Sequence, residues 1–261
     1  MCRFGLNRGK NAVNPFGLTS ILTKSKGKSA TRNRGSDYQR NPKEIAMDYI
    51  SEISIIIEYV GIIAFSVSGA MIAIRRKTDF FGVTLLGIIT SFGGGLTRDV
   101  ILGVTPPVMF NSKAELVVSF AVSTIVFFLA RLFSRHYLKN ESKIEHINDV
   151  FDALGLGLFA VIGAKIAIQN GYFDSPLIVI SAGLLTGVCG GLLRDVLTMS
   201  VPFILVKRIY AIAAILGASV YYILVRLGLG ENISMVSGAA ITFTLRILAM
   251  TFKWNLPRAI D

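Results

Sequence analysis

Seven apolar segments, each long enough to cross a membrane, follow one another along the chain. They occupy residues 54–74, 80–102, 114–133, 149–169, 176–198, 205–226 and 232–252. A helix needs about 20 apolar residues to cross the bilayer core, and it satisfies its own backbone hydrogen bonds there. The sequence therefore predicts an all-α integral membrane protein with seven transmembrane helices.

Composition and charge agree with a membrane protein. The chain is 52% hydrophobic and only 16% charged, which is unusual for a soluble domain. Of its net charge of +11, most lies in the first 46 residues, so no nucleic-acid partner is expected and the lipid bilayer is the main partner. The two histidines, His136 and His146, and the two cysteines lack ligand spacing. We predict no metal site and no cofactor.

Residues 1–46 form a basic leader that precedes the first apolar segment. Such a stretch fits a disordered tail, an organellar transit peptide or an upstream extension of a gene whose start codon encodes Met47. The third interpretation is favoured, because "MDYISEIS" leads directly into the apolar segment that follows it.

The apolar region contains an internal repeat. The hexapeptide "GAMIAI" from Gly69 returns as "GAKIAI" from Gly163, and "GGGLTRDV" from Gly93 returns as "CGGLLRDV" from Cys189. We predict one three-helix unit at 50–140, a second at 145–228 and a seventh helix at 231–253. A unit of three spans ends on the opposite side of the membrane from its start. The second unit is therefore inverted, with a pseudo-two-fold axis in the membrane plane.

Lysine and arginine residues predict the orientation. If the first span starts outside, the inner loops and the C-terminal tail hold eleven of these residues and the outer side holds three. Cytoplasmic loops carry the excess of basic residues. We expect a plasma-membrane protein with its N-terminus outside and its C-terminus in the cytoplasm.

Glycines are concentrated where the repeated motif interrupts the second and fifth spans. Gly93, Gly94 and Gly95 in the first copy match Cys189, Gly190 and Gly191 in the second. Glycine costs about 1 kcal/mol relative to alanine inside a helix, so the motif predicts two broken helices that meet near the midplane and bind the solute. Close packing between helices is the alternative role of these glycines.

Each motif also places an arginine beside an aspartate. Because adjacent helical residues point about 100° apart, we predict reciprocal pairing between the copies, Arg98 with Asp195 and Arg194 with Asp99. Charges inside a membrane are candidates for function. The alternative is that the pairs cap helix ends at the interface and extend toward water.

Three other charged residues are possible accessory residues. Glu58 and Asp152 occupy matching positions in spans one and four, where they either partner the arginines or lie at the interface. Lys165 stands where the first repeat has Met71. Its side chain is expected to extend toward the membrane surface, although a lysine there could also sense voltage or block a pore.

These residues resemble the bacterial glycine-transporter-domain family, which is related to the trimeric intracellular cation (TRIC) channels. The resemblance covers residues from about 50 to 255 and rests on two copies of a "GGGxxRD…P" signature. It implies a homotrimer with a pore in each protomer and with spans two and five kinked at their glycines. The channel branch conducts monovalent cations, mainly potassium, whereas the family name refers to proposed glycine uptake. Cys189 departs from the signature, so equal kinking is not implied.

Two transport functions use the same residues. In a passive pathway for small monovalent cations, freed carbonyls replace hydration water, and Asp99 and Asp195 offset the arginines. That pathway is the leading interpretation. In the second, a carrier for glycine or a similar small amino acid, the arginines or helix N-termini hold the carboxylate, and carbonyls or the aspartates hold the ammonium group. A membrane enzyme acting on a lipid phosphate is disfavoured, because the chain has no nucleophile and base constellation. A scaffold without transport is the fourth alternative.

Overall fold

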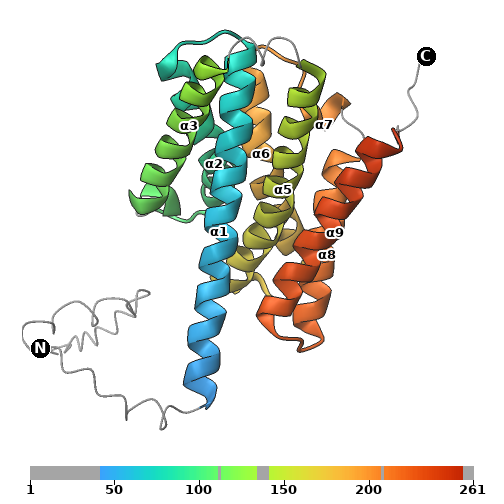
Figure 1. Ribbon diagram of the computed structural model, residues 1–261. Coiled ribbons are helices and arrows are strands. Elements are labelled where there is room, and N and C mark those ends of the chain that lie inside the picture. The colour runs from blue at the N-terminus through green and yellow to red at the C-terminus, as the bar shows by residue number, and fades with distance from the viewer. Residues whose placement is uncertain (1–41, 111–112, 134–140, 207–208, 255–261) are drawn as a thin grey trace, which may run out of the picture. The chain divides into compact units, whose positions relative to one another are not determined.

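The computed structural model describes residues 42–110, 113–133, 141–206 and 209–254. Most of the predicted leader, residues 1–41, lies outside these described residues. The structure is helical, and Figure 1 shows its helices arranged as a bundle. The helices are α1 (Pro42–Arg75), α2 (Phe80–Leu102), η2 (Val108–Phe110), α3 (Lys113–Leu132), α5 (Glu141–Ala167), η3 (Ile168–Tyr172), α6 (Pro176–Leu197), α7 (Phe203–Val206), α8 (Tyr210–Arg226) and α9 (Glu231–Thr251).

Six described helices are long and apolar enough to cross a membrane, and α8 is a shorter apolar helix of 17 residues. The chain is therefore a multi-pass membrane protein. The predicted span 80–102 has the same bounds as α2. The predicted span 205–226 begins too early, because Ile209 is left-handed, with a φ of 52°, and α8 starts after it. Helix α8 packs against α5, α6 and α9.

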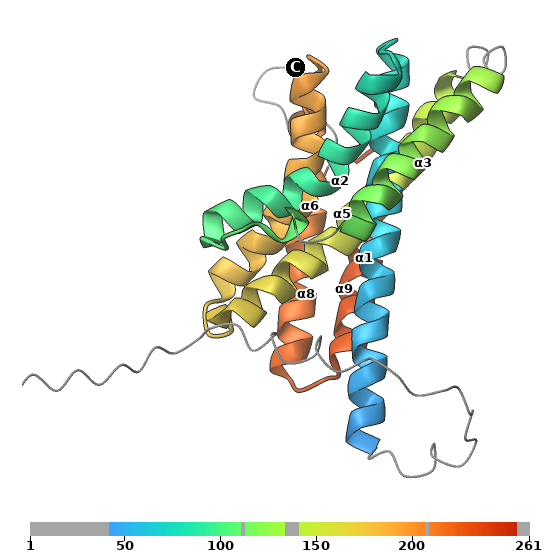
Figure 2. The same cartoon turned by 90° about the vertical axis from the view of Figure 1, so that its left-hand side faces the viewer.

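The predicted breaks in the second and fifth spans are not found. Helices α2 and α6 are each continuous through their glycines, although Figure 2 shows that α2 bends along its length. The hydroxyls of Thr90 and Thr186 donate to the carbonyls of Leu86 and Ala182, at 2.6 and 2.7 Å. Such bonds to the preceding turn commonly bend a helix without interrupting it. The glycines thus remain in hydrogen-bonded helix.

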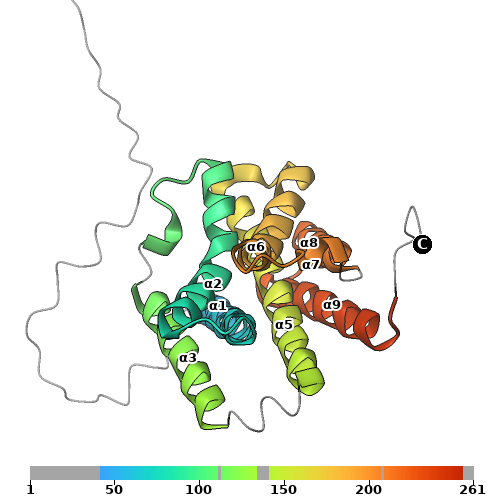
Figure 3. The ribbon, with the colours of Figure 1, turned by 90° about the horizontal axis from the view of Figure 1, so that it is seen from above.

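Helices α2 and α6 cross at the glycines with almost no space between their backbones. A Cβ atom on Gly94 would collide with the carbonyl oxygen of Thr186, and a Cβ on Gly190 would collide with that of Thr90. Each of these four residues has its repeat counterpart in the other helix, at a displacement of 96 residues. The contact is therefore reciprocal. Viewed from above, α3 and α9 lie on opposite sides of this central pair (Figure 3).

Helices α1 and α5 make a second reciprocal contact. The rings of Phe65 and Phe159, which correspond at a displacement of 94 residues, stack with their centroids 5.2 Å apart and their planes 24° apart. The Phe65 ring lies against Gly155, and the Phe159 ring lies 3.3 Å from the Cβ position of Gly61. The two helices thus exchange the same aromatic and glycine positions.

Buried hydroxyls hold α1, α2 and α3 together. Ser66 donates to Ser119 at 2.8 Å, and Ser91 and Ser119 are hydrogen bonded at 2.9 Å. Repeat counterparts of these serines in α5, α6 and α8 have no hydroxyl: they are Ala160, Gly187 and Ala214. The two three-helix groups therefore share their geometry but differ in what joins their helices.

Candidate functional site

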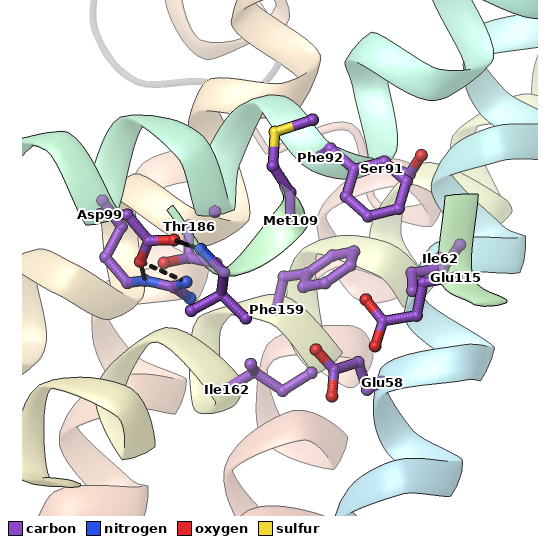
Figure 4. Close-up of a pocket in the computed structure, with 13 residues that line it drawn as sticks. Glu58, Ile62, Ser91, Phe92, Asp99, Met109, Glu115, Phe159, Ile162 and Thr186 are labelled. Carbon is purple, nitrogen blue, oxygen red and sulfur yellow. Dashed lines mark hydrogen bonds and ion pairs between the residues drawn. The ribbon is translucent and has the colours of Figure 1, made fainter. Parts of the chain in front are cut away.

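The arginine of the first motif forms its ion pair within its own helix. The Arg98 guanidinium donates from Nε and Nη2 to Asp99 Oδ1, at 2.8 and 2.7 Å. The other oxygen, Asp99 Oδ2, accepts from the backbone N–H of Val108 at 2.9 Å (Figure 4). Both side chains are at most 4% exposed. Asp99 therefore links the end of α2 to the first residue of η2.

The second motif repeats this arrangement and extends it. Arg194 donates from Nε to Asp195 Oδ1 at 2.9 Å, and Asp195 Oδ2 accepts from the N–H of Phe203 at 2.8 Å. Arg194 Nη1 also donates to Asp152 Oδ1 at 2.8 Å and to Ser68 Oγ at 2.6 Å. Arg194 thus joins α1, α5 and α6 while its side chain is 0% exposed.

The predicted pairing between the two motifs is wrong. Arg98 binds Asp99 instead of Asp195, and Arg194 binds Asp195 instead of Asp99. The 100° separation between adjacent helical residues applies to their Cβ directions. An arginine side chain is long and flexible enough to fold back across that angle. For Asp152, the sequence left two alternatives, an arginine partner or an interfacial position, and the Arg194–Asp152 ion pair agrees with the first.

A small pocket of about 40 Å³ lies beside the Arg98–Asp99 pair. That is room for a few water molecules at most. Figure 4 shows the carboxylates of Glu58, from α1, and Glu115, from α3, close together on one side of it. The apolar part of the wall includes Ile62, Phe92 and Phe159. The pocket is therefore acidic on one side and aromatic on the other.

The corresponding region around Arg194 is closed and fully buried. Asp152 Oδ2, Arg194 Nη2 and the Asn148 amide nitrogen have no hydrogen-bond partner among the described residues. The Tyr210 hydroxyl and Arg194 Nη2 lie 3.2 and 3.4 Å from the Cβ position of Gly191. Buried polar atoms are normally hydrogen bonded, often to internal water. This cluster is suited to hold a bridging water above Gly191.

The two regions are repeat counterparts, and we call them half-sites. The first half-site consists of Glu58, Gly95, Arg98, Asp99 and Glu115. The second half-site consists of Asp152, Gly191, Arg194, Asp195 and Tyr210. The half-sites differ at one position in particular, where an acidic glutamate corresponds to a neutral tyrosine. The first half-site has a pocket and a surplus of carboxylates, and the second is sealed.

Glu115 and Tyr210 were not predicted as site residues. They correspond at a displacement of 95 residues, the same displacement that relates Arg131 to Arg226. That shared displacement was the signal that could have identified them. Glu115 lies one residue into the predicted third span, where a carboxylate is ordinarily interfacial, so it did not stand out.

The motif glycines serve the helix crossing and the half-sites differently. Gly93 and Gly94 face α6: the backbone of Thr186 leaves no room for a side chain on Gly94, whereas a Cβ on Gly93 would displace the end of the Leu193 side chain. Gly190 meets α2 in the same way. By contrast, the Cβ position of Gly95 has only Arg98 Nη2 within 4 Å, at 3.6 Å. The small-residue packing role therefore applies to Gly93, Gly94 and Gly190, whereas Gly95 borders the pocket.

Lys165 is paired inside the protein. Its Nζ lies 2.7 Å from a carboxylate oxygen of Glu231 in α9 and donates to Ser54 Oγ in α1 at 2.6 Å. The lysine side chain is 14% exposed and that of Glu231 is 33% exposed. Lys165 thus joins α1, α5 and α9.

We expect Lys165→Met, which restores the residue of the first repeat, to destabilise the protein by about 1 kcal/mol, because Glu231 loses its partner in a partly buried setting. The double variant Lys165→Met/Glu231→Gln should recover most of that loss. Thermal unfolding of purified protein in detergent measures both effects. A double variant less stable than the single one would contradict the pairing.

The sequence of this chain is similar to those of known membrane proteins. A family model described as "Glycine transporter" matches the chain twice, over residues 55–131 and 149–226. The chain belongs to the glycine transporter family. A relative, the UPF0126 membrane protein YvgT of Bacillus subtilis, is 36% identical to this chain over 203 residues. The match covers 77% of this chain and 94% of YvgT.

Solved structures place this glycine transporter family member among proteins related to TRIC channels. The TRIC trimeric intracellular cation channel orthologue from Rhodobacter sphaeroides is 34% identical, with a TM-score of 0.69, and the match covers 77% of this chain and 99% of that one. A prokaryotic TRIC channel crystallised in 0.5 M KCl is also 34% identical, with a TM-score of 0.71, covering 79% and 100%. The predicted family relationship is confirmed.

Proposed function

We propose that the protein is a homotrimeric membrane channel in which each protomer forms a passive pathway for small monovalent cations such as potassium. Its relatives with solved structures are described as cation channels, one of them as trimeric. These relatives, like YvgT, are membrane proteins rather than members of enzyme families. We assign no catalytic residue.

The observation that carries this proposal is the acidic pocket of the first half-site. Carboxylates of Glu58 and Glu115 border it next to a buried arginine whose charge Asp99 already balances. Acidic side chains that line a pocket favour cations over anions there. The continuous helices provide no freed carbonyls, so side chains would replace part of the hydration shell. The pathway is proposed to pass the motif residues Gly93, Gly94, Gly95, Gly190 and Gly191 and both Arg–Asp pairs.

We further propose that the two units form an inverted repeat with the N-terminus outside. Reciprocal contacts of Gly94 with Thr186 and of Gly190 with Thr90 support a two-fold relation between α2 and α6. Three helices in each unit place the second unit upside down relative to the first. The distribution of basic residues supports a cytoplasmic C-terminus in the plasma membrane.

Purified protein in liposomes tests the proposal. Potassium efflux and uptake of labelled glycine are measured side by side on the same preparation, with protein-free liposomes as the blank. Potassium efflux without glycine uptake supports the channel. Saturable glycine uptake without potassium current would instead identify a carrier for a small amino acid, and it would require the pocket to expand around that larger solute.

Glu115→Gln is expected to lower the unitary potassium conductance about twofold at low ionic strength, because one negative charge is lost at the pocket. The difference should shrink in high salt, where the remaining charge is screened. Recordings in planar bilayers at two potassium concentrations measure this. Glu145→Gln, at a half-exposed position of α5 that lies 3.9 Å from Arg75 and does not line the pocket, serves as the control and should conduct like the wild type. A loss that is equal at both concentrations would argue against a charge effect.

A further inference from the structure

We propose that the stacked rings of Phe65 and Phe159 form the hydrophobic barrier of the pathway, between the two half-sites. This inference rests on the proposed cation pathway and identifies the residues that set its resting permeability. It is drawn from the order of residues along α1 and α5 and from the way the two rings are held.

Helix α1 places Phe65 between the half-sites. Glu58 and Ile62 line the pocket of the first half-site, whereas Ser68 accepts a hydrogen bond from Arg194 in the second. Glu58 and Ser68 are about 15 Å apart along the helix axis, at 1.5 Å per residue. Phe65 lies on the stretch between them and is 1% exposed.

Helix α5 places Phe159 in the same layer. Asp152 binds Arg194 in the second half-site, and Ile162 lines the pocket of the first. Phe159 lies between these residues, and its ring forms part of the pocket wall (Figure 4). A cation entering the pocket from the first half-site therefore meets this aromatic wall before it can reach Arg194.

The two rings are held in place by contacts on both sides. They stack on each other, and each lies against a glycine of the opposite helix, Phe65 on Gly155 and Phe159 on Gly61. Hydrophobic constrictions in channels block ions by excluding the water that would hydrate them. Wetting this layer, by a rotation of the rings or by a polar side chain, would connect the acidic pocket to the unpartnered polar atoms around Arg194.

Leucine and asparagine are close in size but opposite in polarity. Replacing a phenylalanine with each in turn therefore distinguishes entry of water into the aromatic layer from simple widening of that layer. In liposomes loaded with potassium chloride, Phe159→Asn is expected to raise the resting potassium efflux about tenfold or more over Phe159→Leu, as lowering a barrier does. Phe65→Asn and Phe65→Leu should repeat the order. Phe127, in α3, packs on Phe80 and lies outside the half-sites. Phe127→Asn is therefore the control for the same substitution and should leave potassium efflux at the wild-type level.

Size-exclusion chromatography checks that each variant retains the oligomeric state of the wild type. If the asparagine variants do not assemble, the smaller pair Phe159→Thr and Phe159→Val makes the same comparison. Equal efflux from the polar and apolar variants, with measurable wild-type current, would overturn the barrier and leave the pathway standing. The absence of potassium current from every protein would overturn the pathway and the barrier together.

Discussion

Replacing Arg194 with alanine is expected to destabilise the protein by about 3–5 kcal/mol, the cost of breaking a buried ion pair from one side. Arg194 is the shared partner of two fully buried carboxylates, those of Asp152 and Asp195. Its removal leaves both of them without a counter-charge in a fully buried region. Thermal unfolding and the yield of assembled protein in detergent measure the loss.

Arg98→Ala is the matched control at the repeat counterpart. Arg98 pairs with one carboxylate, Asp99, and it lies beside a pocket that has room for water. Its loss should therefore be smaller than that of Arg194→Ala. The double variant Arg194→Ala/Asp152→Asn should recover part of the loss, because one unpaired charge is removed with the arginine. Equal losses for the two single alanine variants would contradict the difference between the half-sites.

Replacing Gly94 with alanine is expected to cost about 1–3 kcal/mol or more through overpacking. The added methyl group would collide with the carbonyl oxygen of Thr186, and a backbone atom in the middle of a helix cannot move aside as a side chain can. Helices α2 and α6 would have to separate at the crossing. Unfolding in detergent and potassium efflux from liposomes should both report the change.

The adjacent glycine provides the control for this variant. Among the described residues, and apart from the backbone of α2 itself, the one atom within 4 Å of the new methyl group at Gly95 is Arg98 Nη2, at 3.6 Å. Gly95→Ala should therefore leave stability unchanged or raise it by up to about 1 kcal/mol, the difference in helix propensity. If both alanine variants were equally destabilised, the cost would come from the glycine-rich segment as a whole and not from the crossing at Gly94.

Hydropathy predicted where most membrane helices lie, because the bilayer imposes one length and one polarity on all of them. Hydropathy did not predict the ends of helices that extend beyond their apolar residues. Helix α5 begins at Glu141, eight residues before the predicted span at 149, because the polar stretch "ESKIEHIN" is also helical. Broken helices were predicted from the glycines together with the repeat, yet α2 and α6 are both continuous through their motifs.

The candidate site was predictable in its residue types but not in its contacts. The repeat identified Arg98, Asp99, Arg194 and Asp195 as a set, because the same residues recur at equal spacing. It could not specify which carboxylate each arginine binds. That depends on the arginine rotamer and on the backbone N–H that binds the second oxygen of each aspartate. Lys165 shows the same limit, because its partner Glu231 lies in α9, outside the repeated units.

The stack of Phe65 on Phe159 has a consequence for how such a protein could have arisen. A residue that touches its own counterpart is what an isologous dimer has at its symmetry axis. In the proposed inverted repeat, each three-helix unit corresponds to one subunit of a homodimer. The two rings then correspond to the same phenylalanine in the two subunits, in contact across the two-fold axis. Fusion into one chain frees each copy to mutate separately. The serines that join α1, α2 and α3 correspond to alanine and glycine in the other unit, a difference that two identical chains of a homodimer cannot have.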